Sequence, residues 1–242
     1  MNRLMKKLNA NYLFLLLPIM AYILPGPFLI SKVAEWRGKL KIHTLEVHSE
    51  ATLFSKGKEI GQGTILEYYR APYERREERQ IERRKEITLW KGVKKYVRGE
   101  GGQWKESETR MQPEQILLVG TPKDSELTKS LERLGIDLKQ RRLDRLQGKV
   151  CVVVGSEKPE DKQPELWLDH KTFKPLRFID YSEAEGKPLL VDTRFTDYSS
   201  SVSGEWFPRL IEKYINGALT ERREIIEIKV NPTLDKALFE TK

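Results

Sequence analysis

The side chains that could do nucleophilic chemistry are few in this chain of 242 residues. Its one cysteine, Cys151, lies inside the apolar run 150–154. Three histidines are scattered through the chain, at His43, His48 and His170. A nucleophilic thiol needs a histidine base beside it, and no motif spacing links these residues. A lone cysteine in such a run is typical of a small buried hydrophobic side chain.

Carboxylates offer a second kind of chemistry, because paired acids can bind metal ions or transfer protons. Four aspartates fall in or beside expected strands at irregular spacing: Asp169, Asp180, Asp192 and Asp197. Positions on solvated strand faces and in turns explain these aspartates better than a catalytic or metal-binding site does. The segment Gly61-Gln62-Gly63 lacks the third glycine and the following helix of a phosphate-binding loop. We therefore predict that the chain is not an enzyme and that it binds no metal ion and no cofactor.

The composition is typical of a soluble folded domain and argues against nucleic-acid binding. Charged residues make up 33% of the chain, hydrophobic residues make up 38%, and the net charge is +8. Basic and acidic residues are mixed nearly everywhere, whereas a nucleic-acid-binding protein concentrates its positive charge on one face. In the densest run, 73–85, four glutamates offset much of the charge of six basic residues. We interpret that run as solvated strand faces and a turn, and we predict no nucleic-acid partner.

The first 30 residues differ from the rest of the chain. Three basic residues precede the uncharged stretch 8–31, whose core, 12–24, is mostly large and apolar. This pattern is typical of an export signal, and the core is shorter than the roughly 20 apolar residues of a membrane-spanning helix. We predict that residues 1–30 are a cleaved export signal or, since no Ala-x-Ala site is present, an uncleaved inner-membrane anchor; a buried core helix is the third alternative. The first two alternatives place the domain 31–242 in the periplasm.

Strand signals dominate the body of the chain. The clearest is Asn216-Gly217, which lies between two strand-like runs, because both residues tolerate the positive φ angles of a type I′ hairpin turn. In the second run, Ile226, Ile228 and Val230 alternate with charged residues, which predicts a strand that buries these three side chains on one face.

The remaining patterns predict about ten strands and a few helices. Helices are expected over 31–41, 113–119 and 125–134, where leucines recur at helical spacing in the last segment and Gly135 follows it. The strands are joined mainly by hairpins, which predicts an antiparallel sheet. A sheet of this size normally curls or closes on itself.

Short motifs occur in a characteristic order along the body. The N-terminal half contains Gly61-Gln62-Gly63-Thr64 and the turn Arg70-Ala71-Pro72. The C-terminal half contains Leu143-Asp144-Arg145-Leu146-Gln147-Gly148-Lys149, Trp167-Leu168-Asp169, Thr172-x-x-Pro175-Leu176-Arg177, Trp206-Phe207-Pro208 and Val230-Asn231-Pro232-x-Leu234-Asp235-x-x-Leu238-Phe239. This order resembles that of the bacterial outer-membrane lipoprotein-sorting family of LolA-like proteins, although Ala71 is an extra residue within the Arg-Pro turn of the family.

The resemblance implies an α+β, β-rich fold: a single strongly curved antiparallel sheet, or incomplete β-barrel, with helices covering its concave face. It also implies a periplasmic, non-enzymatic, monomeric carrier that binds the acyl chains of a lipid or lipoprotein in an apolar cavity. Membrane-bound donor and acceptor complexes would be its further partners. The physical need is clear, because each lipid CH₂ exposed to water costs about 0.8 kcal/mol. The alternative is an envelope-tethered protein-binding or sensing module of the same fold.

The resemblance also suggests site residues. Inward apolar and aromatic side chains are the candidates for lining a cavity of several hundred Å³: Ile65, Tyr68, Trp90, Tyr96 and Phe178. In the family's carrier, the arginine of the Arg-Pro turn ties a helical lid closed, so Arg70 is the lid-tethering candidate.

Overall fold

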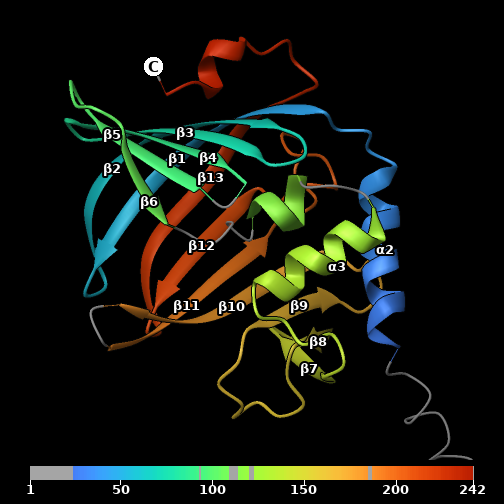
Figure 1. Ribbon diagram of the computed structural model, residues 1–242. Helices are drawn as coiled ribbons and strands as arrows, with labels where there is room; N and C mark the ends of the chain where they lie inside the picture. The colour runs from blue at the N-terminus through green and yellow to red at the C-terminus, as the bar shows by residue number, and fades with distance from the viewer. Residues whose placement is uncertain (1–23, 93, 109–113, 120–122, 185–186, 242) are drawn as a thin grey trace, which may run out of the picture.

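The computed structural model describes residues 24–92, 94–108, 114–119, 123–184 and 187–241 (Figure 1). The strands in these ranges form one antiparallel sheet in the order β6-β5-β4-β3-β2-β1-β13-β12-β11-β10-β9-β8-β7. Each half of the chain is thus a meander, and the pairing of β1 with β13 joins the two halves in the middle of the sheet. The strands are Thr44–Ser55 (β1), Lys58–Arg70 (β2), Glu74–Ile81 (β3), Arg84–Lys91 (β4), Lys94–Gly99 (β5), Lys105–Glu108 (β6), Arg141–Leu146 (β7), Lys149–Val154 (β8), Glu165–Asp169 (β9), Pro175–Ala184 (β10), Lys187–Thr196 (β11), Leu210–Ile215 (β12) and Ala218–Val230 (β13).

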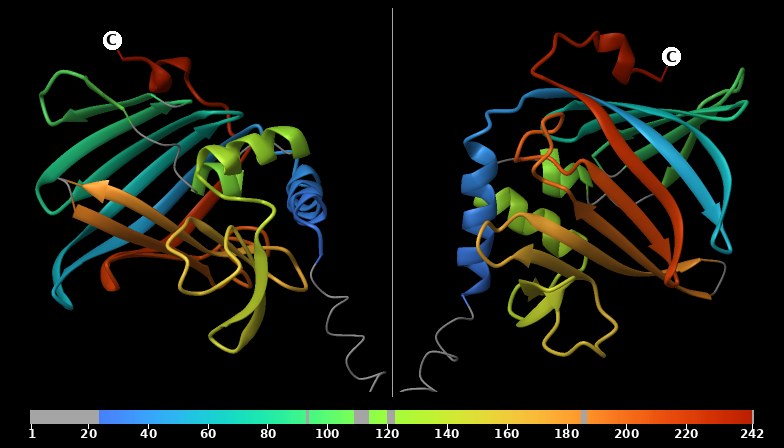
Figure 2. Two further views of the ribbon diagram at one scale, coloured as in Figure 1. Left: turned by 60° about the horizontal axis from the view of Figure 1, so that its bottom comes forward. Right: turned by 180° about the vertical axis from the view of Figure 1, so that it is seen from behind.

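The sheet is curved and remains open between β6 and β7, its two edge strands. Figures 1 and 2 show the helix α2 (Gly26–Gly38), the π-helical segment η1 (Gln115–Val119) and the helix α3 (Asp124–Arg133) gathered against one face of this layer. The predicted fold class, a single curved antiparallel sheet with helices on its concave face, is confirmed. The described ranges contain thirteen strands rather than about ten, because short edge strands such as β6 carry little apolar alternation.

The main core lies between these helices and the C-terminal half of the sheet. Aliphatic side chains from α2, η1 and α3 meet aromatic and aliphatic side chains of the strands. Its members include Leu29, Ile30, Val33, Leu117, Leu127, Leu131, Leu45, Val47, Tyr69, Leu166, Phe178 and Phe195, each at most 2% exposed. The helices are therefore part of the hydrophobic core, and their removal would expose the concave face to water.

Helix α2 begins five residues before the predicted start of 31. Pro25, Gly26 and Pro27 read as helix breakers in the sequence, yet a proline is tolerated in the first helical turn, where its missing N–H has no intrahelical partner. Leu29 and Ile30 are 0% and 1% exposed, so residues within the expected export segment 1–30 contribute to the core. Residues 1–23 lie outside the described ranges. Within those ranges, no helix is both long and apolar enough to span a membrane.

The predicted hairpin at Asn216-Gly217 is confirmed. Ile215 pairs with Ala218 across the turn, and the φ angles of Asn216 and Gly217 are 49° and 81°, as a type I′ turn requires. The predicted dry face of the second strand is wrong in part. Its register against β1 shifts at Ile226, so this residue bulges out and is 46% exposed, while Ile225 is buried. A bulge adds one residue to a strand and so reverses the faces on either side of it.

Beyond the bulge, Ile228 is half-buried against the main core, but Val230 at the end of β13 is 47% exposed. The chain then turns back over β3. The short 3₁₀ segment η2 (Lys236–Phe239) is held there by Arg76, whose Nη1 donates to the Leu238 carbonyl at 2.9 Å. The C-terminal segment thus packs back onto the sheet.

Candidate functional site

The helix-covered side of the sheet, here called the inner face, can be followed strand by strand from the main core. Tyr69 of β2 belongs to that core, so Glu67 and Ile65 also point inward, because side chains alternate along a strand. The register places Arg75 of β3 opposite Tyr69, and Trp90 of β4 opposite Arg75. The inner face of the N-terminal half therefore carries charged and polar groups between its aromatic rings.

Six residues of β2, β3 and β13 form a buried set of salt bridges, here called the inner ion-pair network: Glu67, Arg75, Glu77, Arg79, Glu221 and Arg223. Arg75 is 1% exposed, with its Nε 3.0 Å from Oε1 of Glu67 and its Nη2 2.9 Å from Oε2 of Glu77. The Tyr69 hydroxyl donates to the same Glu67 oxygen at 3.0 Å. Three cations thus face three anions, and the network is neutral as a whole.

Arg223 reaches the other members of the network across a neighbouring strand. Its Nη1 lies 3.5 Å from carboxylate oxygens of Glu67 and Glu77, although β1 separates β13 from β2. The intervening inward residues of β1 are Ser49 and Ala51, whose small side chains leave room for the guanidinium.

The network overturns the interpretation of run 73–85 as solvated strand faces. The run does form two strands and a turn, but Arg75, Arg76 and Glu77 are at most 8% exposed. Charges are costly to bury unless they are paired, and here Arg75 and Glu77 pair with each other and also with Glu67 of β2 and Arg223 of β13, outside the run. The local sequence contained one signal of an inward face: Arg75, Glu77 and Arg79 recur at every second position and so share a strand face with Ile81.

The paired arginines keep two buried glutamates ionised. Burial alone would raise the pKa of Glu221, but Arg223 and Arg79 outweigh burial and hold that pKa below its usual range. The pKa of Glu77 is lowered in the same way, with burial opposed by Arg223, Arg75 and Arg79. The charged half of the inner face is thus stable as a set of ions, and these ions interrupt its apolar side chains.

The five predicted cavity residues do not share one wall. Ile65, Trp90 and Phe178 lie on the inner face, in three separate surroundings: a small cluster with Ala51 and Ile81, the face of the Arg75 guanidinium at 4.5 Å, and the main core. Tyr68 and Tyr96 lie on the opposite face and are half-buried. The sequence pattern alone could not assign them, because a shift of one residue exchanges the two faces.

Arg70, the lid-tethering candidate, points to the face away from the helices. Its Nε donates to Glu74, and its guanidinium stacks 4.3 Å from the ring of Phe239. In this structure Arg70 therefore contacts the C-terminal segment. The helices are joined instead by Arg37 of α2, whose Nη1 donates to the Ile116 carbonyl of η1.

An apolar pocket opens beside Arg37, between the end of α2, the β2–β3 turn and η1. We call it the α2 pocket; its volume is about 390 Å³. Most of its wall is aliphatic, with three basic side chains and, among the described residues, no acidic one. The lining residues are Arg37, Gly38, Leu40, Lys41, Ile42, His43, Ala71, Pro72, Leu118 and Val119.

Two segments that carry the LolA-like resemblance position the wall of the α2 pocket. Ala71, from the Arg70-Ala71-Pro72 turn, donates its N–H to the His43 carbonyl at 2.9 Å. Asn231 holds the other side of the same loop: its Oδ1 accepts from the His43 N–H at 2.7 Å and its Nδ2 donates to the Lys41 carbonyl at 3.1 Å. The pocket therefore lies at one end of the sheet, where β1 begins and its two neighbours, β2 and β13, end.

Arg37 is the unusual member of this lining. It is 5% exposed, its Nη2 has no hydrogen-bond partner within the described part of the chain, and burial lowers its pKa to about 9. We did not predict it from the sequence. The signal was present, because Ile30, Val33, Ala34 and Arg37 follow the helical spacing of one buried face.

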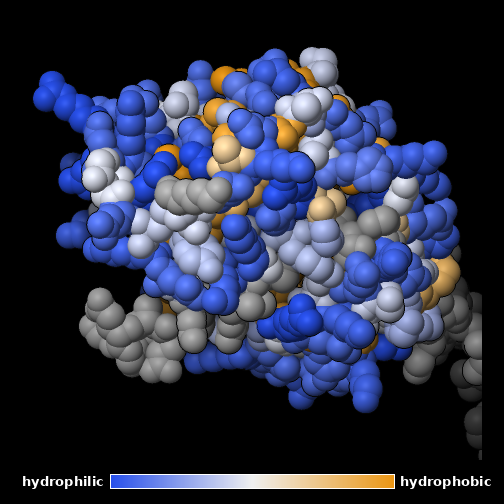
Figure 3. Space-filling model, turned by 45° about the horizontal axis from the view of Figure 1, so that its top comes forward, coloured by the Kyte–Doolittle hydropathy of each residue, from blue (hydrophilic) through white to orange (hydrophobic). Residues whose placement is uncertain are grey.

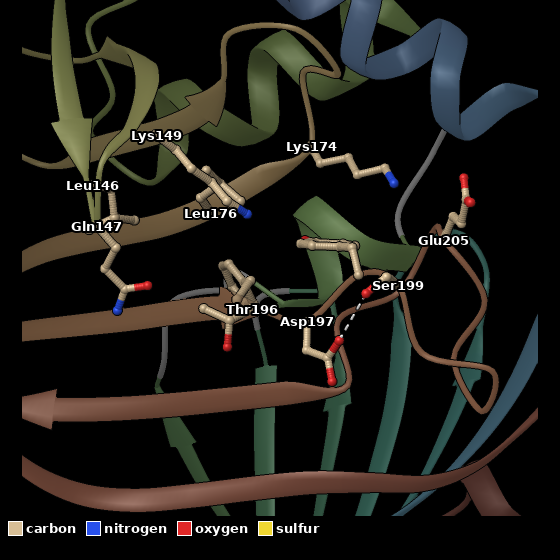
Figure 4. Close-up of a pocket in the computed structure, with 11 residues that line it drawn as sticks. Leu146, Gln147, Lys149, Lys174, Leu176, Thr196, Asp197, Ser199 and Glu205 are labelled. Carbon is tan, nitrogen blue, oxygen red and sulfur yellow. Dashed lines mark hydrogen bonds between the residues drawn. The ribbon is translucent and has the colours of Figure 1, made fainter.

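A second pocket, of about 380 Å³, lies among the β7–β8 turn, the β9–β10 turn and the loop after β11 (Figure 4). Lysines and acids both line it, among them Lys149, Lys174, Asp197 and Glu205. Tyr198 is fixed here by a 2.6 Å hydrogen bond from its hydroxyl to the Pro175 carbonyl, and burial raises its pKa well above the usual value. The mixed charges make this pocket less suited to an apolar ligand than the α2 pocket.

The rest of the described surface offers little else. In the described ranges, no group of three or more His, Cys, Asp or Glu side chains could hold a metal ion. Cys151 is buried, as predicted, and burial raises the pKa of its thiol. Figure 3 shows a mainly hydrophilic face on which apolar side chains form only small patches.

Comparisons with known proteins bear on the fold. No family model and no curated protein matches the chain. Among solved structures, it is similar to a LolA superfamily protein from Nitrosomonas europaea, with a TM-score of 0.56 and 12% identity over 90% of this chain and 98% of that one. A DUF1329 family protein from Desulfovibrio piger gives 0.54 and 11% over 90% and 98%. A putative outer membrane lipoprotein-sorting protein domain from Vibrio parahaemolyticus gives 0.53 and 10% over 87% and 95%. The chain therefore has a LolA-like fold.

Proposed function

We propose that this chain is a non-enzymatic binding protein of the periplasm that holds an acyl chain of a lipid or lipoprotein in the α2 pocket. The observation that carries the proposal is the aliphatic wall of this pocket, which Leu40, Ile42, Leu118 and Val119 form at the mouth of a LolA-like sheet. Its volume lies within the range of about 300–1,000 Å³ that is usual for small-ligand sites.

The charged half of the inner face limits where an apolar ligand can lie. An acyl chain laid over Arg75 and Glu67 would remove ionised groups from their partners without offering hydrogen bonds, which is costly. The α2 pocket avoids this cost, because the aliphatic side chains Leu40, Ile42, Leu118 and Val119 line it. We therefore expect a ligand with one acyl chain in the pocket, rather than the several acyl chains that the resemblance implies.

A second candidate is a protein-binding or sensing module of the same fold, which would remain tethered by its N-terminal segment. The ion-pair network favours this alternative, because it fills inner-face space that a carrier of several acyl chains would need. Mass spectrometry of the mature N-terminus separates the two, since a tethered domain cannot shuttle between membranes.

The test of lipid binding uses a fluorescent, uncharged monoacylglycerol as the probe. We expect saturable binding to the wild-type chain, and Ile42→Asn should weaken it by at least about tenfold, because an amide would enter the aliphatic wall without a partner. Ile60→Asn is the matched control, since Ile60 is 63% exposed and lies outside the pocket. Absence of saturable binding would contradict the function, and equal binding by Ile42→Asn would contradict the site.

A further inference from the structure

The guanidinium of Arg37 is enclosed without a matching anion. It lies in the wall of the α2 pocket, is 5% exposed, and donates one hydrogen bond, to the Ile116 carbonyl. Its Nη2 has no partner among the residues that the structure describes. A buried guanidinium normally has a carboxylate beside it, because an unpaired charge away from water is costly.

The described surroundings of Arg37 in the pocket supply no negative charge. The rim of the pocket carries two exposed basic residues, Lys41 and His43, and no described lining residue is acidic. The inner ion-pair network shows the contrast, because each of its arginines has at least one glutamate within 4 Å. Burial lowers the pKa of Arg37 to about 9, which is the response of a cation that lacks compensation.

We infer that the α2 pocket selects an anionic amphiphile, whose carboxylate or phosphate pairs with Arg37 while its acyl chain lies against the aliphatic wall. This inference rests on the proposed function. A guanidinium suits this role because its planar fork can donate two parallel hydrogen bonds to either kind of anion. The anion would occupy the free Nη2 position, and the bond from Nη1 to the Ile116 carbonyl would hold the fork in place.

The test compares three ligands that have the same twelve-carbon chain: laurate, lauryl phosphate and uncharged monolaurin. Each displaces the fluorescent probe at neutral pH. We expect at least one of the two anions to bind at least about tenfold more tightly than monolaurin, as a hydrogen bond to a charged group implies. The tighter anion identifies which headgroup the site prefers.

Arg37→Met should remove this preference, so that laurate and lauryl phosphate bind no more tightly than monolaurin. Lys39→Met is the matched control, because Lys39 lies at the same helix end, is exposed, and does not line the pocket. It should keep the preference. If Arg37→Met does not fold, the salt dependence of the wild-type preference is the test. A preference for the anions that persists from about 0.05 M to about 0.5 M salt supports pairing with the buried Arg37. A preference that disappears over this range points to the exposed rim and overturns the inference.

The outcomes separate the two claims. If none of the three ligands binds, the proposed function fails and the inference fails with it. If monolaurin and both anions bind equally, the proposed function stands and the role of Arg37 is overturned. If the anions are preferred but Arg37→Met keeps the preference, Arg37 is likewise overturned as the anion-binding group.

Discussion

Arg75 of β3 and Glu67 of β2 form a salt bridge on the inner face of the sheet, where both residues are 1% exposed. The pair sits at the centre of a network in which strands from both halves of the chain contribute charges, since Arg223 of β13 also approaches Glu67. The network thus links the N-terminal meander to the C-terminal one through side chains as well as through the pairing of β1 with β13.

Removal of Arg75 should destabilise the fold strongly. Arg75→Leu leaves Glu67 and Glu77 buried beside an apolar group, and loss of one partner of a buried pair costs about 3–5 kcal/mol of unfolding free energy. Lys94→Ala breaks an exposed pair with Glu106 and should leave the stability nearly unchanged. Urea denaturation measures both variants. Equal stabilities for the two would contradict the structural role of the network.

Acid should unfold the protein through the same network. The folded-state pKa values of Glu77 and Glu221 lie below the unfolded value of 4.5. Their stabilising contribution is therefore fully present above about pH 5 and is lost as the pH falls from there toward the folded pKa values. Urea midpoints measured from neutral pH down to about pH 3 should fall accordingly.

Glu221→Gln should lower stability at neutral pH and flatten its dependence on acid. Glu35→Gln provides the control. Hydrogen bonds from Lys32 and, to a lesser extent, Lys39 lower the pKa of Glu35 to about 2. This carboxylate is nevertheless exposed on α2, where solvent screens its pairing with the two lysines. A pH profile of Glu221→Gln that matches the wild type would show that Glu221 does not contribute to acid sensitivity.

The first turns of α2 should be part of the stable domain. Leu29→Ala removes a fully buried side chain and should cost about 2–5 kcal/mol. The neighbouring Phe28 is 41% exposed, so Phe28→Ala should cost much less. Thermal unfolding of the two variants tests the difference. If Leu29→Ala is as stable as Phe28→Ala, residues 26–30 do not pack on the sheet.

The bulge in β13 predicts opposite outcomes for two adjacent isoleucines. Ile225 is 1% exposed within the main core, and Ile225→Ala should cost about 2–5 kcal/mol. Ile226 bulges outward, and Ile226→Ala should have a small effect. Denaturation with urea distinguishes them. The reverse order of stabilities would place the register of β13 one residue away from the one described.

Asn231 should act on ligand binding through the loop that it holds. Asn231→Ala removes hydrogen bonds to the backbone of Lys41 and His43 and should weaken monoacylglycerol binding. Asn216→Ala is a close match, because Asn216 also has a positive φ and accepts a backbone N–H, from Leu190, far from the pocket. Both variants should lose about 1–3 kcal/mol of stability, but only Asn231→Ala should bind the probe less tightly. Equal binding by the two would remove Asn231 from the site.

Local signals in the sequence determined much of the fold. Asn216-Gly217 specified its hairpin because the turn depends only on the φ preferences of two adjacent residues. The leucines of 125–134 predicted α3, which spans Asp124–Arg133, because helical periodicity is also a local property. The order of the motifs pointed to a curved open sheet with helices inside it, and the structural comparison confirms that fold.

What the tertiary structure decided is which charges and apolar groups meet. Run 73–85 looks solvated by itself. In the folded sheet Arg75 and Glu77 pair with each other, and the neighbouring β2 and the approach of β13 add Glu67 and Arg223 as partners, which makes these charges stable in the interior. The bulge at Ile226 reversed a face that alternation had assigned. The α2 pocket joins residues 37–38, 40–43, 71–72 and 118–119, which no local pattern connects. Burial and ion pairing depend on contacts between segments that are distant in the sequence. They are therefore determined by the register of the strands in the folded sheet.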